Sequence, residues 1–78
     1  MELEQIKALA ATIAEDYWKA NKLTQAQLAK QAKVSVRSVY NIEHAIAVYD
    51  ETLEKVMTIC GYDYKVKVSR SLEKREKL

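Results

Sequence analysis

The sequence predicts a mainly α-helical fold, a bundle of four to five helices that ends in one β-strand. Two observations carry this prediction. The 78 residues hold no proline and one glycine, so little interrupts a helix. Apolar residues recur at three- and four-residue steps up to about residue 60, and the period then falls to two over residues 62–69. A chain of this length is one small domain with a marginal core.

The first helix is predicted from about Glu2 to Asn21. Its apolar residues fall on one stripe, as a helix packed against a core requires: Leu3, Ile6, Ala10, Ile13 and Tyr17. Asn21 tolerates the left-handed backbone that ends helices. Trp18 is expected in the core.

Residues 23–43 contain two short amphipathic helices and a tight connection. Thr24 and Gln27 form a capping box at the start of one helix, and Ser35 caps the other. Leu23, Ala26, Leu28, Ala29 and Ala32 are predicted to form the apolar face of the first helix. Val39 and Ile42 face inward from the second, and Val34 fills the turn. Twenty-one residues leave room only for two helices at a steep angle, which is a helix-turn-helix.

The outward side of the second helix is short, polar and cationic. It holds Ser35, Val36, Arg37, Ser38, Tyr40 and Asn41. Residues 22–49 carry four cations against Glu43, a balance of +3 within a whole-chain charge of +2. Such a surface suits base edges in the DNA major groove, which admits one helix.

Residues 23–43 resemble the DNA-binding domains of the Xre/Cro/λ-repressor family. The positions that match the family pattern are Leu23, Thr24, Gln25, Leu28, Ala29, Val34, Ser35, Val39, Ile42 and Glu43. Three features depart from it: Lys33 and Ala45 stand where the family usually has glycine, and the connection over residues 45–50 lacks the family's common proline. A left-handed backbone at Lys33 costs more conformational energy than it would at glycine. Some strain or a different turn is therefore expected there, without loss of the fold.

The resemblance implies roles for individual residues. Val36, Arg37, Tyr40 and Asn41 become the base-reading candidates. Gln25, Lys33, Ser35, Ser38 and His44 become the candidates for contacts with DNA phosphates. In relatives the glutamate at position 43 pairs with an arginine of the first helix, where this chain has Trp18. Lys19 or Lys22 is expected to replace that partner, or Glu43 caps nearby backbone.

The last predicted helix begins at the cap Asp50 and ends at Gly61. Leu53, Val56, Met57 and Cys60 form its inward stripe. Residues 62–69 then alternate as a strand, with one face formed by Tyr62, Tyr64, Val66 and Val68. A lone strand leaves its backbone unpaired, so pairing with the same strand of a second copy is predicted. The alternative is an extended arm packed on the chain's own helices.

This layout is similar to that of HipB-type antitoxins, which join through a small intersubunit sheet. The predicted organisation is a helix-turn-helix domain over residues 1–61, a dimerisation strand over 62–69 and a charged, frayed or helical tail over 70–78. The expected function is a sequence-specific regulator of transcription, a repressor that binds a palindromic double-stranded DNA operator as a homodimer. A variant of this expectation is that the chain is the antitoxin of a toxin–antitoxin pair, which would also bind a cognate toxin protein. The alternative is a protein-interaction module that keeps the scaffold without binding DNA.

Other functions are disfavoured by what the sequence lacks. It has no set of catalytic residues and no phosphate-binding glycine loop, so no enzyme is expected. One cysteine allows no internal disulfide, and His44 with Cys60 is too few ligands for zinc; Cys60 is expected to be a small buried apolar residue. No apolar run or signal sequence indicates a membrane or secretion, which suggests a cytoplasmic protein. Neither a cofactor nor a small-molecule ligand is expected.

Overall fold

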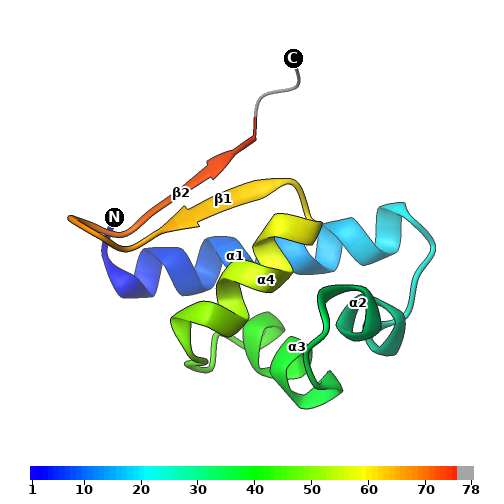
Figure 1. Ribbon diagram of the computed structural model, residues 1–78. Coiled ribbons are helices and arrows are strands. Elements are labelled where there is room, and N and C mark those ends of the chain that lie inside the picture. The colour runs from blue at the N-terminus through cyan, green and yellow to red at the C-terminus, as the bar shows by residue number, and fades with distance from the viewer. Residues whose placement is uncertain (76–78) are drawn as a thin grey trace.

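The computed structural model describes residues 1–75 and places four helices before a small antiparallel sheet (Figure 1). The helices are α1 (Leu3–Ala20), α2 (Gln25–Ala32), α3 (Val36–Glu43) and α4 (Asp50–Ile59). They are followed by β1 (Tyr62–Lys65) and β2 (Ser71–Lys74). The prediction of a mainly helical fold is confirmed. The prediction of a single strand is wrong, because the chain forms a hairpin.

The core lies where the four helices and the hairpin meet. Its largest fully buried side chains come from every helix: Ile6, Leu28, Met57, Val39 and Val56. Burying each such side chain contributes about 1.5–3 kcal/mol relative to exposure. Ala26 is exposed, contrary to prediction, because α2 turns Leu28, Ala29 and Ala32 inward instead. Trp18 packs against the core, as expected.

The predicted helix caps are mostly present. The Thr24 hydroxyl accepts from the Gln27 amide at 3.1 Å, and the Gln27 side chain accepts from the Thr24 amide at 2.8 Å. Ser35 accepts from the amide of Ser38 at 3.1 Å. The cap predicted at Asp50 is wrong, since Tyr49 occupies that position and Asp50 begins α4.

Three non-glycine residues adopt a left-handed backbone. Lys33 and Ala45 have φ of 59° and 55°. Lys22 has φ of 54°, whereas Asn21 keeps φ of −96°. Asn21 therefore caps α1, but the left-handed residue is its neighbour. The turn at Lys33 is therefore left-handed and carries the strain that a side chain adds in this conformation.

The hairpin pairs Tyr62 with Lys74 and Lys65 with Ser71, and residues 66–70 connect the two strands. Tyr64 is buried against the helices, and Tyr62 packs on the core. These tyrosines therefore contact the chain's own interior, as in the alternative of a packed arm. The tail predicted over residues 70–78 is corrected over 71–74, which form β2. Residues 76–78 lie outside the described part of the chain.

Candidate nucleic-acid interface

A short connection sets α3 against α2. The amide of Val34 donates to the carbonyl of Ala29 at 3.0 Å, and the Val34 side chain packs against the core. On α3, Val39 and Ile42 are buried, which fixes the rotation of the helix about its axis. The opposite side must then face outward. In Figure 1, α3 lies at the edge of the molecule opposite the hairpin.

The predicted base-reading residues lie on this open side of α3. Val36 is 48% exposed and Tyr40 41% exposed, and Arg37 is exposed as well. Asn41 is half-buried. The structure thus brings the four residues together on one surface of a helix that is anchored by its other side.

Three side chains stack along one side of α3. The Arg37 guanidinium lies 5.6 Å from the centre of the Tyr40 ring, and the Tyr40 and His44 rings stack with centroids 3.9 Å apart. The Nδ1 atom of His44 lies 2.8 Å from the carbonyl oxygen of Tyr40. Cation–π contact of this kind restricts an arginine without using its N–H donors. Arg37 is therefore partly ordered while its donors stay free.

The residues proposed for phosphate contact surround the ends of α2 and α3. Lys33, Ser35 and His44 are exposed, and Ser38 is half-buried. The hydroxyls of Ser35 and Ser38 lie 2.9 Å apart. Because a hydroxyl can donate while it accepts, one of the pair still has a proton for an external oxygen.

Gln25 makes a hydrogen bond within the chain that the sequence did not predict. Its side-chain Nε2 donates to the Glu43 carboxylate at 2.8 Å, in a partly buried contact that ties the start of α2 to the end of α3. Glu43 therefore does not take Lys19, Lys22 or backbone as its hydrogen-bond partner, as had been expected. The Gln25 amide group carries two N–H donors, so one is left for a phosphate.

Tyr49 is a further candidate that sequence reasoning missed. It is 87% exposed and caps α4. Together with Ser38, Asn41 and Thr52 it lines a shallow groove between α3 and the connection to α4. The signal for it was slight: one aromatic residue in a stretch without regular periodicity, outside the matched motif.

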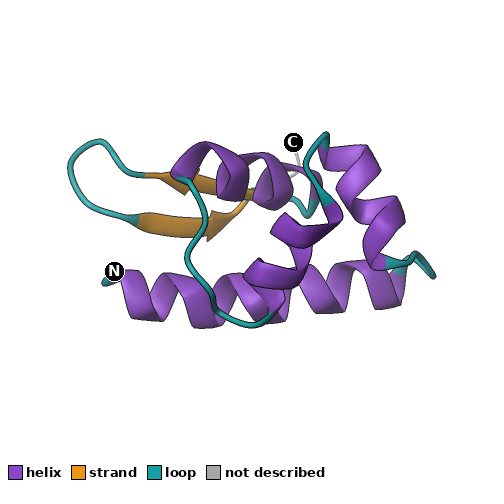
Figure 2. Ribbon diagram, turned by 90° about the horizontal axis from the view of Figure 1, so that it is seen from below, coloured by secondary structure: helices purple, strands orange, loops and turns teal. Residues whose placement is uncertain are grey.

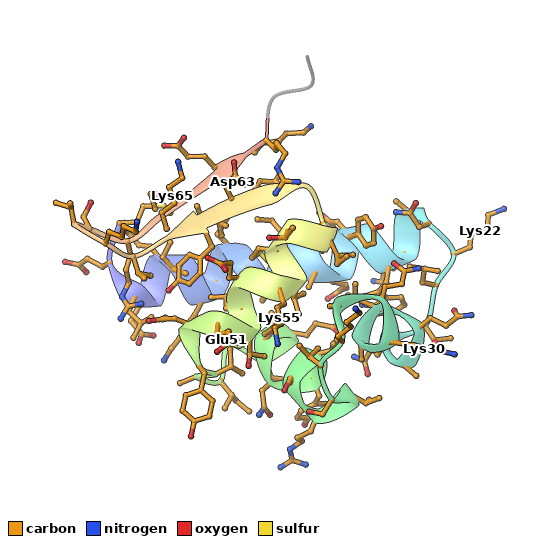
Figure 3. All side chains as sticks on the ribbon, in the orientation of Figure 1. Lys22, Lys30, Glu51, Lys55, Asp63 and Lys65 are labelled. Atoms are coloured by element: carbon orange, nitrogen blue, oxygen red, sulfur yellow. The ribbon has the colours of Figure 1, made fainter. Side chains whose placement is uncertain are left out.

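Four cations of residues 22–37 form no ion pair with a carboxylate within residues 1–75. The ion pairs there use Lys7, Lys19, Lys55, Arg70 and Arg75. By contrast, Lys22, Lys30, Lys33 and Arg37 have no carboxylate partner within the described residues. Figure 3 shows Lys22 and Lys30 extending from the α1–α2 turn and from α2 into solvent. Unpaired exposed cations attract phosphate without losing an internal ion pair.

Other kinds of site find little support among residues 1–75. No group of three or more His, Cys, Asp or Glu side chains is placed there to hold a metal ion. Burial raises the pKa of the Cys60 thiol to about 12, which keeps it protonated and unreactive. In the described chain, no helix has the length and apolar character needed to cross a membrane. No family model matches the sequence, and neither the curated proteins nor the solved structures compared with it contain a match.

Proposed function

We propose that this chain is a sequence-specific DNA-binding regulator of transcription, a repressor in which α2 and α3 form a helix-turn-helix. The observation that carries the proposal is the two-sided character of α3. One side is buried in the core through Val39 and Ile42, and the other presents Arg37 to solvent. A helix of this size fits the major groove, which is about 12 Å wide.

Three side chains on the outer side of α3 have a complementary base edge. Arg37 donates two hydrogen bonds to O6 and N7 of guanine, and Asn41 pairs in the same manner with adenine. Val36 packs on a thymine methyl group. Tyr40 supports Arg37 from behind through the ring contact. The residues that bind phosphates are Lys33, Ser35, Ser38, His44 and Gln25, the last through its second N–H. Tyr49 adds a hydroxyl donor in the groove beside α3.

A homodimer would present two α3 helices about 34 Å apart and thereby select a palindrome. The hairpin supplies an edge for it. Hydrogen-bonded pairs alternate along antiparallel strands, and the Arg75 amide donates to the Gly61 carbonyl at 2.8 Å. Gly61 and Arg75 are thus a hydrogen-bonded pair, and the pairs Tyr62–Lys74 and Tyr64–Leu72 are not. The backbone N–H and C=O groups of Leu72 and Lys74 therefore point away from β1. We therefore propose pairing through the outer edge of β2, which replaces the predicted contacts of Tyr62 and Tyr64.

Val66 and Val68 remain dimer candidates, although they lie in the connection and not in a strand. Val68 is fully exposed and Val66 is 42% exposed. Neither is needed by the core of its own chain. They lie at the end of the hairpin, so a second copy joined along β2 can cover them.

Selection from a random double-stranded DNA pool, followed by mobility shift at two salt concentrations, tests the proposed function. A DNA-binding regulator enriches a palindromic sequence, and its affinity falls steeply with salt while a sequence preference persists. A protein-interaction module on the same scaffold enriches no sequence. If no sequence is enriched after repeated rounds of selection, the proposal of sequence-specific DNA binding is wrong.

A further inference from the structure

A cavity of about 250 Å³ lies between α1, the α3–α4 connection and the hairpin. Its walls are mostly apolar and include Leu3, Ala10, Ile42, Val48 and Leu53. In Figure 2 the connection from α3 to α4 crosses in front of α1. The volume is slightly below the roughly 300–1,000 Å³ of pockets for drug-sized ligands. It suits a smaller organic molecule.

Lys7 places a cation at this apolar cavity. It lies on the same face of α1 as Leu3 and Ala10, at positions i, i+4 and i+7, and lines the cavity with them. Its side chain is 20% exposed, whereas its partner Glu4, 3.2 Å away, is 81% exposed. An ion pair with so exposed a carboxylate is weak. The Lys7 ammonium can therefore take a second anion.

The remaining charges at the cavity neutralise one another. The Tyr64 hydroxyl donates to the Asp50 carboxylate at 2.8 Å, and Arg70 donates to Asp50 at 2.9 Å and to the Tyr64 oxygen at 2.7 Å. Lys7 and Arg70 against Asp50 leave the lining with one net positive charge. Glu4, the exposed partner of Lys7, does not line the cavity, so the excess positive charge of the lining makes the apolar interior complementary to an apolar molecule with one carboxylate.

We propose that this cavity binds a small apolar monocarboxylate, such as an arylalkanoic acid or a short fatty acid. The hydrocarbon part fills the space between α1, Ile42 and Leu53, and the carboxylate pairs with the Lys7 ammonium. No such ligand was expected from the sequence, because the walls come from segments far apart along the chain.

The cavity also adjoins the candidate DNA surface. Ile42 and residues 45–49 line it, and the same connection carries Tyr49. A bound acid would hold this connection against α1 and the hairpin, and so couple the ligand to operator affinity. This regulatory consequence rests on the proposed function, whereas the binding of the acid does not.

The test is a titration of the ¹⁵N-labelled full chain, without DNA, with 3-phenylpropionate and with its neutral analogue 3-phenylpropionamide. Amide shifts report the location and the affinity. We expect the acid to saturate with a dissociation constant on the order of 1 mM or below, a range typical of so small a ligand. The shifts should gather at residues 3–10, 42–50 and 64–70.

Three variants separate the parts of the proposal. Lys7→Met keeps the apolar stem and should weaken the acid about fivefold or more while leaving the amide unchanged. Ala47→Phe, at an exposed lining position, should fill the cavity and abolish both. Lys55→Met removes an exposed lysine paired with Glu51 on α4 (Figure 3) and should change nothing.

The amide spectrum of each variant verifies its fold, and Ala47→Leu replaces Ala47→Phe if the larger ring unfolds the chain. Equal loss of acid and amide on Lys7→Met, or shifts outside the cavity, would overturn the assignment. So would the absence of any shift at about 10 mM acid. The titration contains no DNA, so its result does not depend on whether DNA selection enriches a sequence. The proposals of carboxylate binding and of DNA binding can therefore be refuted independently.

Discussion

Replacing Lys33 with glycine should stabilise the protein. Lys33 has φ of 59° and ψ of 43°, a left-handed conformation that costs an L-residue about 1–2 kcal/mol. Glycine removes this strain but gives the unfolded chain more freedom, worth about 0.4–1 kcal/mol. The side chain is exposed and has no ion pair within residues 1–75. The expected net gain in the free energy of unfolding therefore lies between about 0 and 1.6 kcal/mol, with a central value of about 0.8 kcal/mol.

Urea unfolding followed by Trp18 fluorescence and by circular dichroism measures this change. A matched control exists three residues earlier, because Lys30 is also an exposed lysine of the same charge but lies within α2. Lys30→Gly should lower the free energy of unfolding by about 0.5–1 kcal/mol, since glycine is a poor helix former. If Lys33→Gly destabilises the protein as Lys30→Gly does, the argument from backbone strain is refuted.

Three other predictions concern the DNA surface, the hairpin edge and pH. Arg37→Ala should cost about 1–3 kcal/mol of binding at one base position, whereas Tyr49→Ala should weaken true and scrambled operators alike; competition mobility shifts measure both. If Arg37→Ala weakens binding to true and scrambled operators equally, Arg37 does not read a base. Lys74→Pro removes an outward N–H and should convert a dimer to monomer in sedimentation, while Lys74→Ala, which keeps the N–H, should not. If Lys74→Pro still forms a dimer, pairing through the outer edge of β2 is excluded. The hydrogen bond from Tyr64, followed by that from Arg70, lowers the pKa of Asp50 below its ordinary 3.8. Its contribution to stability is present above that value and is lost as pH falls through the folded pKa. Asp50→Asn should therefore lower the urea midpoint at neutral pH and have little effect in strong acid; a pH-independent difference would argue against the linkage.

The candidate site was predictable where it depends on local sequence. Thr24 and Gln27 cap α2 through a bond between residues three apart, and Ser35 does the same for α3. Which side of α3 faces outward follows from the spacing of Val39 and Ile42. Such interactions join near neighbours in the chain, so periodicity and cap residues reveal them.

The contacts that escaped prediction join residues far apart in the chain. Glu43 bonds Gln25 and not a lysine, because the packing of α3 on α2 brings the end of one helix to the start of the other. β2 has one apolar residue, Leu72, so its strand character comes from pairing with β1 and not from its own pattern. Tyr49 reaches the side of α3 only because the α3–α4 connection folds back along it.

The sequence by itself determined the helices to within one or two residues of their ends and which side of α3 faces outward, since these follow from spacing over one or two turns. Tertiary structure alone decided the partner of the strand, the bond that holds α2 to α3 and the cavity beside Lys7. Each of these depends on how separate segments approach one another, and that approach is set by burial of the whole core.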